Sequence, residues 1–105
     1  MYLPKGILER EKLDAAIAEV KPLLGKEVVR LNYAIEENWS GQPSIYFRVL
    51  LTDRASKPPG LYKVTKRIES IIEQHIDPFN SWDLIPYYHY RNQSEQKMLK
   101  EATWA

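Results

Sequence analysis

The stretch SIYFRVLLTDR, residues 44–54, decides the fold of this chain. Hydrophobic residues occupy every second position from Ile45 to Leu51, which is typical of a strand with one face against a core. Tyr46 and Arg48 alternate with them, so both side chains point to the opposite side of the strand. The core does not explain these two residues, and the pattern therefore predicts a sheet with a second, open face that has a use of its own.

Residues 28–37 alternate in the same way and predict a neighbouring strand. We expect Val29, Leu31, Tyr33 and Ile35 to face the core, and Val28, Arg30, Asn32 and Ala34 to face the open side. Residues 38–44 are rich in turn-forming types, so the two strands are predicted to form an antiparallel hairpin. Trp39 in this connection is expected to cover one end of the core, because loop tryptophans usually pack.

Two segments show helical periodicity. Residues 8–24 place Leu13, Ile17, Val20 and Leu24 at spacings of three and four, and Pro22 should end the regular helix near Val20. The same period returns from Leu61 to Ile76 and is the strongest helical pattern in the chain. The prolines at 58 and 59 separate this second helix from the strand before it.

Residues 82–91, WDLIPYYHYR, predict a third strand, and Pro86 should confine that strand to an edge or a bulge. Depending on register, it adds either Tyr88 and Tyr90 or Tyr87, His89 and Arg91 to the open face. Asn92 and Glu95 form a capping-box pattern ahead of a C-terminal helical tail, residues 93–105. An alternative is that this tail folds over the open face with Met98, Leu99, Ala102 and Trp104.

The predicted order is helix, strand, strand, helix, strand, helix, which suggests an α+β two-layer sandwich: a three-stranded sheet with helices on one face. At 105 residues the chain, 1–105, is expected to be a single compact domain. The order resembles that of the BolA-like and KH-like folds, and FRVLLTD followed by a long amphipathic helix is similar in shape to the BolA pattern. The GxxG loop of KH domains is absent, and the resemblance assigns no site residues.

Composition narrows the classes of function. The chain has no cysteine, which excludes disulfides and thiolate metal sites formed by this chain alone. Its net charge of +1, from 15 basic and 14 acidic residues, argues against a dedicated binder of duplex nucleic acid. The N-terminal residues have neither a signal-peptide core nor a membrane span, so we expect a soluble cytoplasmic protein with no membrane partner.

Catalysis has little support in the sequence. His75 falls at the end of the second long helix, where the negative end of the helix dipole favours a cation, so we expect it to cap the helix rather than to act in catalysis. His89 lies among aromatic residues, without a nucleophile in an elbow context or a metal-ligand spacing nearby. We therefore expect no catalytic residue, no metal and no cofactor. A small enzyme acting on an anionic metabolite would need His89 and an acidic residue such as Asp83 to converge.

A run of cations surrounds the start of the second long helix. It comprises Arg54, Lys57, Lys63, Lys66 and Arg67. The functional interpretation is an anion site, because helix N-terminal amides and nearby cations attract phosphate or an acidic partner. The alternative, a solvated charged surface, is the more common role of such residues.

The sequence as a whole predicts a small non-catalytic binding module. Its partner would be another protein or a second copy of the chain, held on the open face, because tyrosine and arginine are enriched at interface hot spots. The predicted anchors are Arg30, Tyr46, Arg48, Tyr88 and Tyr90. The alternative partner is single-stranded RNA or DNA, bound by the same face together with the cations of residues 54–67.

Overall fold

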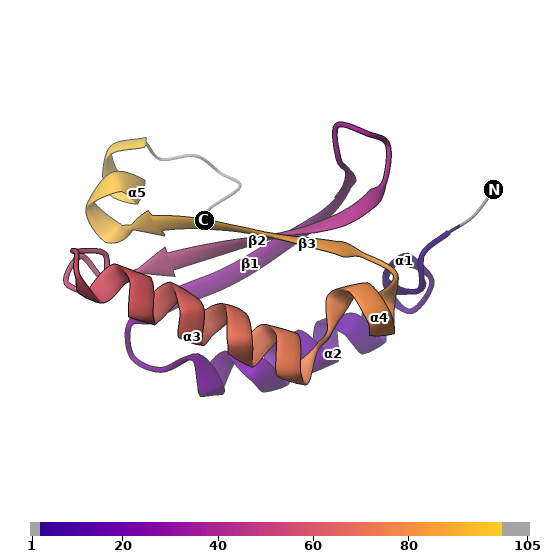
Figure 1. The fold of residues 1–105 in the computed structure, drawn as a ribbon, viewed down its shortest axis with the longest axis horizontal. Coiled ribbons are helices and arrows are strands. Elements are labelled where there is room, and N and C mark those ends of the chain that lie inside the picture. The colour runs from indigo at the N-terminus through magenta and orange to yellow at the C-terminus, as the bar shows by residue number, and fades with distance from the viewer. Residues whose placement is uncertain (1–2, 100–105) are drawn as a thin grey trace.

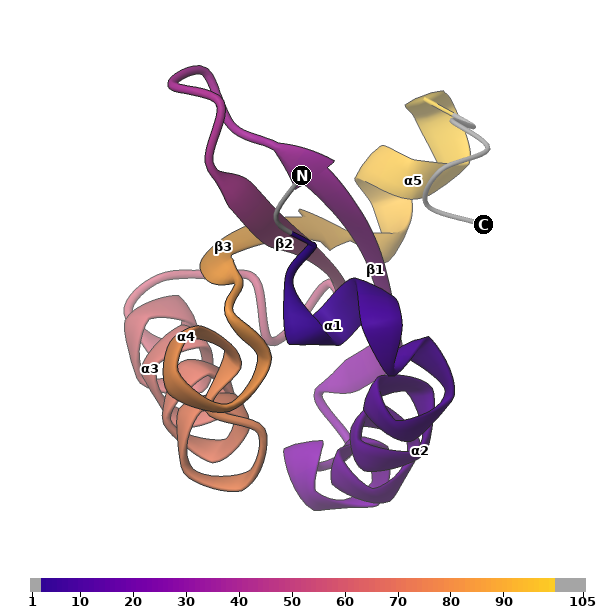
Figure 2. The ribbon, with the colours of Figure 1, turned by 90° about the vertical axis from the view of Figure 1, so that its right-hand side faces the viewer.

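The computed structural model describes residues 3–99, which form the predicted two-layer α+β sandwich (Figure 1). In chain order the elements are α1 (Lys5–Leu8), α2 (Arg10–Val20), the 3₁₀ helix η1 (Lys21–Leu24), β1 (Val28–Glu37), β2 (Pro43–Leu51), α3 (Gly60–His75), α4 (Pro78–Trp82), β3 (Ile85–Asn92) and α5 (Gln93–Leu99). Helices α2 and α3 cover one face of the sheet (Figure 2). The predicted tail begins as α5, and residues 100–105 lie outside the described part of the chain.

The two long helices bury the stripes that their periodicity predicts. In α2, Leu13, Ile17 and Val20 are buried, and Pro22 falls where the α-helix gives way to η1. A proline has no N–H for the next intrahelical bond, which explains the change. In α3, Ile68 and Ile72 have no exposed surface and pack in the same core.

The sheet has the order β1-β2-β3, so the opening stretch of the sequence forms its central strand. Strands β1 and β2 are antiparallel, as predicted, and β3 runs parallel to β2 after the crossover through α3 and α4. Ile45, Phe47, Val49 and Leu51 are fully buried against the helices. Strand β3 lies at the edge, which confirms the position that Pro86 requires.

The start of β1 differs from the predicted alternation. Val28 pairs with Leu51 and Arg30 with Leu50, so Val29 is an extra residue in a β-bulge. Val28 therefore packs against the core, while Val29 is 42% exposed. The prediction was wrong for these two valines, because a bulge reverses the side to which the preceding residues point. Beyond it, Leu31 faces the core as expected.

Trp39 also differs from expectation, because it is 95% exposed at the hairpin tip. The tip is held by Asn38, whose side-chain oxygen accepts hydrogen bonds from the backbone N–H groups of Ser40 and Gln42. Gly41 adopts a φ of 80°, which suits glycine. The loop thus satisfies its own polar groups, and the tryptophan does not cover the core.

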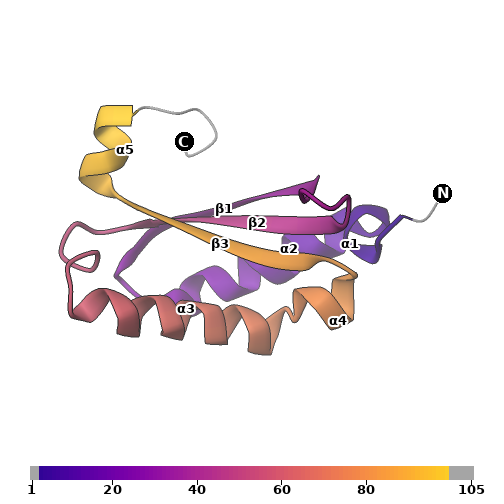
Figure 3. The ribbon, with the colours of Figure 1, turned by 45° about the horizontal axis from the view of Figure 1, so that its top comes forward.

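Helix α5 begins with the predicted capping box. The backbone N–H of Glu95 donates to the Asn92 side chain at 2.7 Å, and the Asn92 N–H donates to the Glu95 carboxylate at 3.1 Å. This reciprocal pair satisfies two donors that the helix itself leaves without partners. It turns the chain directly from β3 into α5, which lies on the side of the sheet away from α2 and α3 (Figure 3).

Candidate functional site: the open face of the sheet

The side of the sheet opposite α2 and α3 is the candidate site, and we call it the open face. Its members, by strand register, are Arg30, Asn32 and Ala34 from β1, Tyr46, Arg48 and Leu50 from β2, and Tyr87, His89 and Arg91 from β3. The hairpin and α5 both extend on this side of the sheet, at its two ends (Figures 1 and 2). The open face is therefore flanked by the hairpin at one end and by α5 at the other.

The rings of Tyr46, Tyr87 and His89 lie together at the centre of the open face. Tyr46 lies between Ala34 and Tyr87 in the register, and its ring stacks on that of Tyr87 with centroids 5.0 Å apart and planes 12° apart. The His89 ring lies 5.9 Å from Tyr46 at 23°. The Tyr87 hydroxyl accepts a hydrogen bond of 3.1 Å from the Asn38 amide, which fixes this ring against the base of the hairpin.

Cations flank the ring cluster. Arg48 lies opposite His89 on one side and opposite Asn32 on the other, and Arg30 follows along β1. At the α5 end, the Arg91 guanidinium donates to the Gln96 side chain at 3.1 Å. The central part of the open face thus combines aromatic rings with positive charge, the arrangement that Tyr46 and Arg48 predict.

Tyr88 and Tyr90 do not lie on the open face, so this part of the predicted site was wrong. They pair with Phe47 and Val49 and point toward the helix layer. The Tyr88 hydroxyl donates to Glu73 at 2.8 Å, and the Tyr90 hydroxyl donates to Glu69 at 2.7 Å. Burial, reinforced by the neighbouring carboxylates, raises the pKa of both tyrosines far above its usual value. The other predicted register holds, and Tyr87, His89 and Arg91 are the β3 residues of the open face.

Leu50 is on the open face but only 5% exposed, so it offers little surface to a partner. Helix α5 contacts β2 and β3 at this end of the sheet. Met98, which the covering alternative places on the open face, is instead 84% exposed. The Leu99 side chain, Ala102 and Trp104 lie outside the described residues.

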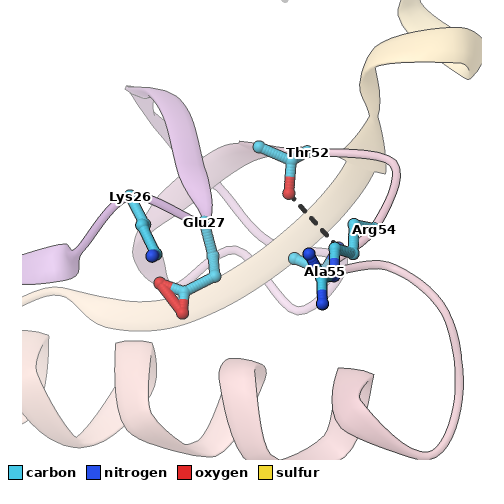
Figure 4. A pocket seen from close by; sticks show the side chains of 5 residues that line it. All are labelled: Lys26, Glu27, Thr52, Arg54 and Ala55. Atoms are coloured by element: carbon cyan, nitrogen blue, oxygen red, sulfur yellow. Dashed lines mark hydrogen bonds between the residues drawn. The ribbon is translucent and has the colours of Figure 1, made fainter.

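Three of the five predicted anion-site cations have different surroundings: Arg54 and Lys66 line separate hollows, and Arg67 is paired with Glu27. Arg67 donates to the Leu24 carbonyl at 2.7 Å and to the Glu27 carboxylate at 3.1 and 3.2 Å, and this hydrogen bonding lowers the pKa of Glu27. Arg54 lines a hollow of about 570 Å³ together with Lys26, Glu27, Thr52 and Ala55 (Figure 4). Lys57, Lys63 and Lys66 do not line it. Arg67 is engaged by Glu27 and Leu24, so it acts as a structural link between α3 and the η1–β1 turn.

We expect Arg67→Ala to lower the free energy of unfolding by about 1 kcal/mol, mainly through loss of the hydrogen bond to the Leu24 carbonyl. The partly exposed ion pair with Glu27 adds little to this value. Lys63→Ala, on the same helix, should change stability by less than about 0.5 kcal/mol. Urea denaturation of both variants checks the difference, and equal effects would contradict the structural role of Arg67.

The residues considered for catalysis are also separated. Asp83 precedes β3 and accepts a hydrogen bond from the Lys5 backbone N–H. His89 lies beside Tyr46 in the middle of the sheet, four residues beyond the start of β3 and so about 13 Å further along it. The two groups do not converge as the enzyme alternative would need. Within residues 3–99, no group of three histidine or acidic side chains is placed to hold a metal ion.

His75 lies in the last turn of α3, the position that its sequence context predicts. In the described part of the chain, no helix has the length and apolar character needed to cross a membrane. Comparison with known proteins adds no assignment, since no family model, curated protein or solved structure matches the chain. The open face, with its rings and cations, is the feature from which a function can be inferred.

Proposed function

We propose that this protein is a non-catalytic, cytoplasmic binding module that holds another protein on its open face. The observation that supports the proposal best is the cluster of Tyr46, Tyr87 and His89, flanked by Arg48 and Arg30, on the face opposite the long helices. Tyrosine and arginine contribute disproportionately to protein interfaces. The cations favour a partner segment that carries carboxylates beside an apolar or aromatic residue.

Single-stranded nucleic acid is the alternative partner, and ring geometry distinguishes the two. Bases stack on aromatic faces that lie open to solvent. Here the near-parallel rings of Tyr46 and Tyr87 stack on one another, so a base would have to compete with an existing contact. The chain's net charge of +1 also gives weak support for phosphate binding. These points favour a protein partner.

The test is capture from native lysate, with and without nuclease, by the wild-type protein and by the double variant Tyr46→Ala with Arg48→Glu. We expect a nuclease-resistant protein to be captured by the wild type, and its affinity for the double variant to fall at least about tenfold. The thermal midpoint should change little, since both side chains lie outside the core. Captured protein that binds the double variant equally well would contradict the proposal.

Arg54→Glu is the matched control, because this exposed cation lies away from the open face but inside the cluster assigned to nucleic acid. It should leave the capture of a protein partner unchanged. If nuclease instead removes the captured material, and Arg54→Glu and added salt both weaken its binding, the partner is nucleic acid and the proposed function is wrong.

A further inference from the structure

The outer edge of β3 is a second surface with recognition chemistry. The order β1-β2-β3 gives β3 a strand neighbour on one side only within residues 3–99. Figure 3 shows β3 as the outermost strand, with α3 running along the layer beneath it. An edge of this kind presents backbone donors and acceptors that another extended chain can pair with.

Along a strand, the backbone N–H and C=O groups of successive residues point alternately to its two sides, and this alternation shows which groups of β3 point away from β2. The Asn92 N–H donates to the Glu95 side chain and not to β2, so even-numbered residues of β3 direct their N–H groups away from the sheet. Pro86 is also an even-numbered residue of β3. It has no N–H, and the outward side is where an edge strand tolerates proline. The outward groups in the middle of the strand are therefore the N–H and C=O groups of Tyr88 and Tyr90.

An apolar hollow of about 550 Å³ lies beside one end of this edge. It is lined by Pro58, Pro59, Leu61, Tyr62, Thr65 and Tyr90. These residues come from the loop before α3, from the first turns of α3 and from β3, so the hollow lies between helix and edge strand. It is large enough to take an apolar side chain, and Tyr62 is 69% exposed at its margin.

Further along α3 the surface next to the edge strand is acidic. The Glu69 and Glu73 carboxylates accept hydrogen bonds from the Tyr90 and Tyr88 hydroxyls, which holds them next to the edge strand. They line a second hollow of about 330 Å³ together with Lys66, Ser70 and Gln74. The Lys66 ammonium lies 5.5 Å over the Tyr62 ring, toward the apolar end. The charged groups that line this second hollow are two carboxylates and one ammonium, so its lining is net negative.

We propose that the outer edge of β3, with the adjoining surface of α3, binds an extended peptide segment as a fourth strand. The peptide pairs with the outward groups of Tyr88 and Tyr90, places an apolar side chain in the hollow beside Tyr90, and directs lysine or arginine toward Glu69 and Glu73. Side chains of an added strand alternate between faces, so the apolar and basic residues are two or four positions apart. This site is separate from the open face and does not depend on its function.

The test measures the affinity of two labelled heptapeptides by fluorescence anisotropy. The first peptide is Thr-Lys-Thr-Lys-Thr-Leu-Thr. The second has glutamate in place of both lysines. We expect the lysine peptide to bind at least tenfold more tightly. The Glu69→Gln/Glu73→Gln variant should lose most of this preference, since glutamine still accepts the tyrosine hydrogen bonds but carries no charge.

Glu11→Gln/Glu19→Gln is the matched control, because it removes two exposed carboxylates from α2 and should keep the full preference. The open-face variant Tyr46→Ala with Arg48→Glu should also bind the lysine peptide normally, which separates this site from the proposed function. Equal affinity for both peptides, or loss of preference in the α2 control, would overturn the proposal.

Amide hydrogen exchange locates the bound peptide. Exchange at Tyr88 and Tyr90 should be fast in the free protein and slow with saturating lysine peptide, whereas His89 should be protected in both, because its N–H points to β2. Unchanged exchange at Tyr88 and Tyr90 would contradict strand addition. Protection that rises with protein concentration, without peptide, would assign this edge to a second copy of the chain and also overturn the proposal.

Discussion

Replacing Phe47 with alanine is expected to lower the free energy of unfolding by about 3 to 5 kcal/mol, a large part of the stability of a small domain. Phe47 lies at the middle of the central strand and is fully buried. Its ring stacks on that of Tyr88 at 5.4 Å and 17°, and it pairs with Tyr33 on the other side. Truncation removes the transfer free energy of the ring and leaves a cavity where strands on both sides prevent collapse.

Urea denaturation measures the loss for Phe47→Ala, and Phe79→Ala provides the same chemical change at a surface position. Phe79 is 61% exposed on α4, so its truncation should change the free energy of unfolding by less than about 0.5 kcal/mol. A loss below about 1 kcal/mol for Phe47→Ala would contradict the position of this ring in the core.

The fold was largely predictable because local pattern and tertiary packing agree. Phe47 and its alternating neighbours specify a half-buried strand, and Pro22 and Pro86 mark the end of a helix and the edge of the sheet. The bulge at Val29 was not predictable, since an extra residue in one strand depends on its partner. The exposed Trp39 was missed for a similar reason: the loop satisfies its polar groups through Asn38 and needs no packing.

The third strand shows why the prediction was wrong for part of the site. Tyr88 and Tyr90 alternate as regularly as Tyr87 and His89, so periodicity alone fits either face. A partial signal was nevertheless present in α3. Glu69 and Glu73 are four residues apart on a helix, about 6 Å, and tyrosines two apart on a strand are separated by about 6.6 Å. This match is compatible with Tyr88 and Tyr90 on the helix side, where the structure places them, but Tyr87 and His89 have the same spacing.

The cations of residues 54–67 are close in sequence, but they do not share one role in the structure. Arg67 is directed toward Glu27, forty residues earlier in the chain, and sequence pattern does not reveal a partner at such separation. By contrast, Tyr46 and Arg48 were placed correctly, because strand alternation is a local property. The open face was thus predictable on its central strand, and less so where register with β3 decides its members.

Raising the pH above 10 is expected to destabilise the protein steeply through Tyr88 and Tyr90. Burial and the nearby carboxylates of Glu73 and Glu69 raise the pKa of both hydroxyls in the folded state, whereas in the unfolded chain tyrosine has a pKa of about 10. Below pH 10 both states hold these protons, and the tyrosines contribute their full stability. Above pH 10 the unfolded state releases them first, so the free energy of unfolding falls by less than about 1.4 kcal/mol per pH unit for each tyrosine, since both side chains are partly exposed and solvent screens their interactions.

The double variant Tyr88→Phe with Tyr90→Phe isolates this effect. At pH 8 it should be less stable than the wild type by about 1 to 3 kcal/mol, because two hydroxyl hydrogen bonds to carboxylates are lost. Neither phenylalanine ionises, so its stability should fall less steeply between pH 10 and 11.5, and the two curves should converge. The other ionisable groups are the same in both proteins, so their contributions cancel in the comparison. Urea denaturation across this range decides the matter: parallel curves would show that the two hydroxyls ionise equally in the folded and unfolded states, contrary to their position between β3 and α3.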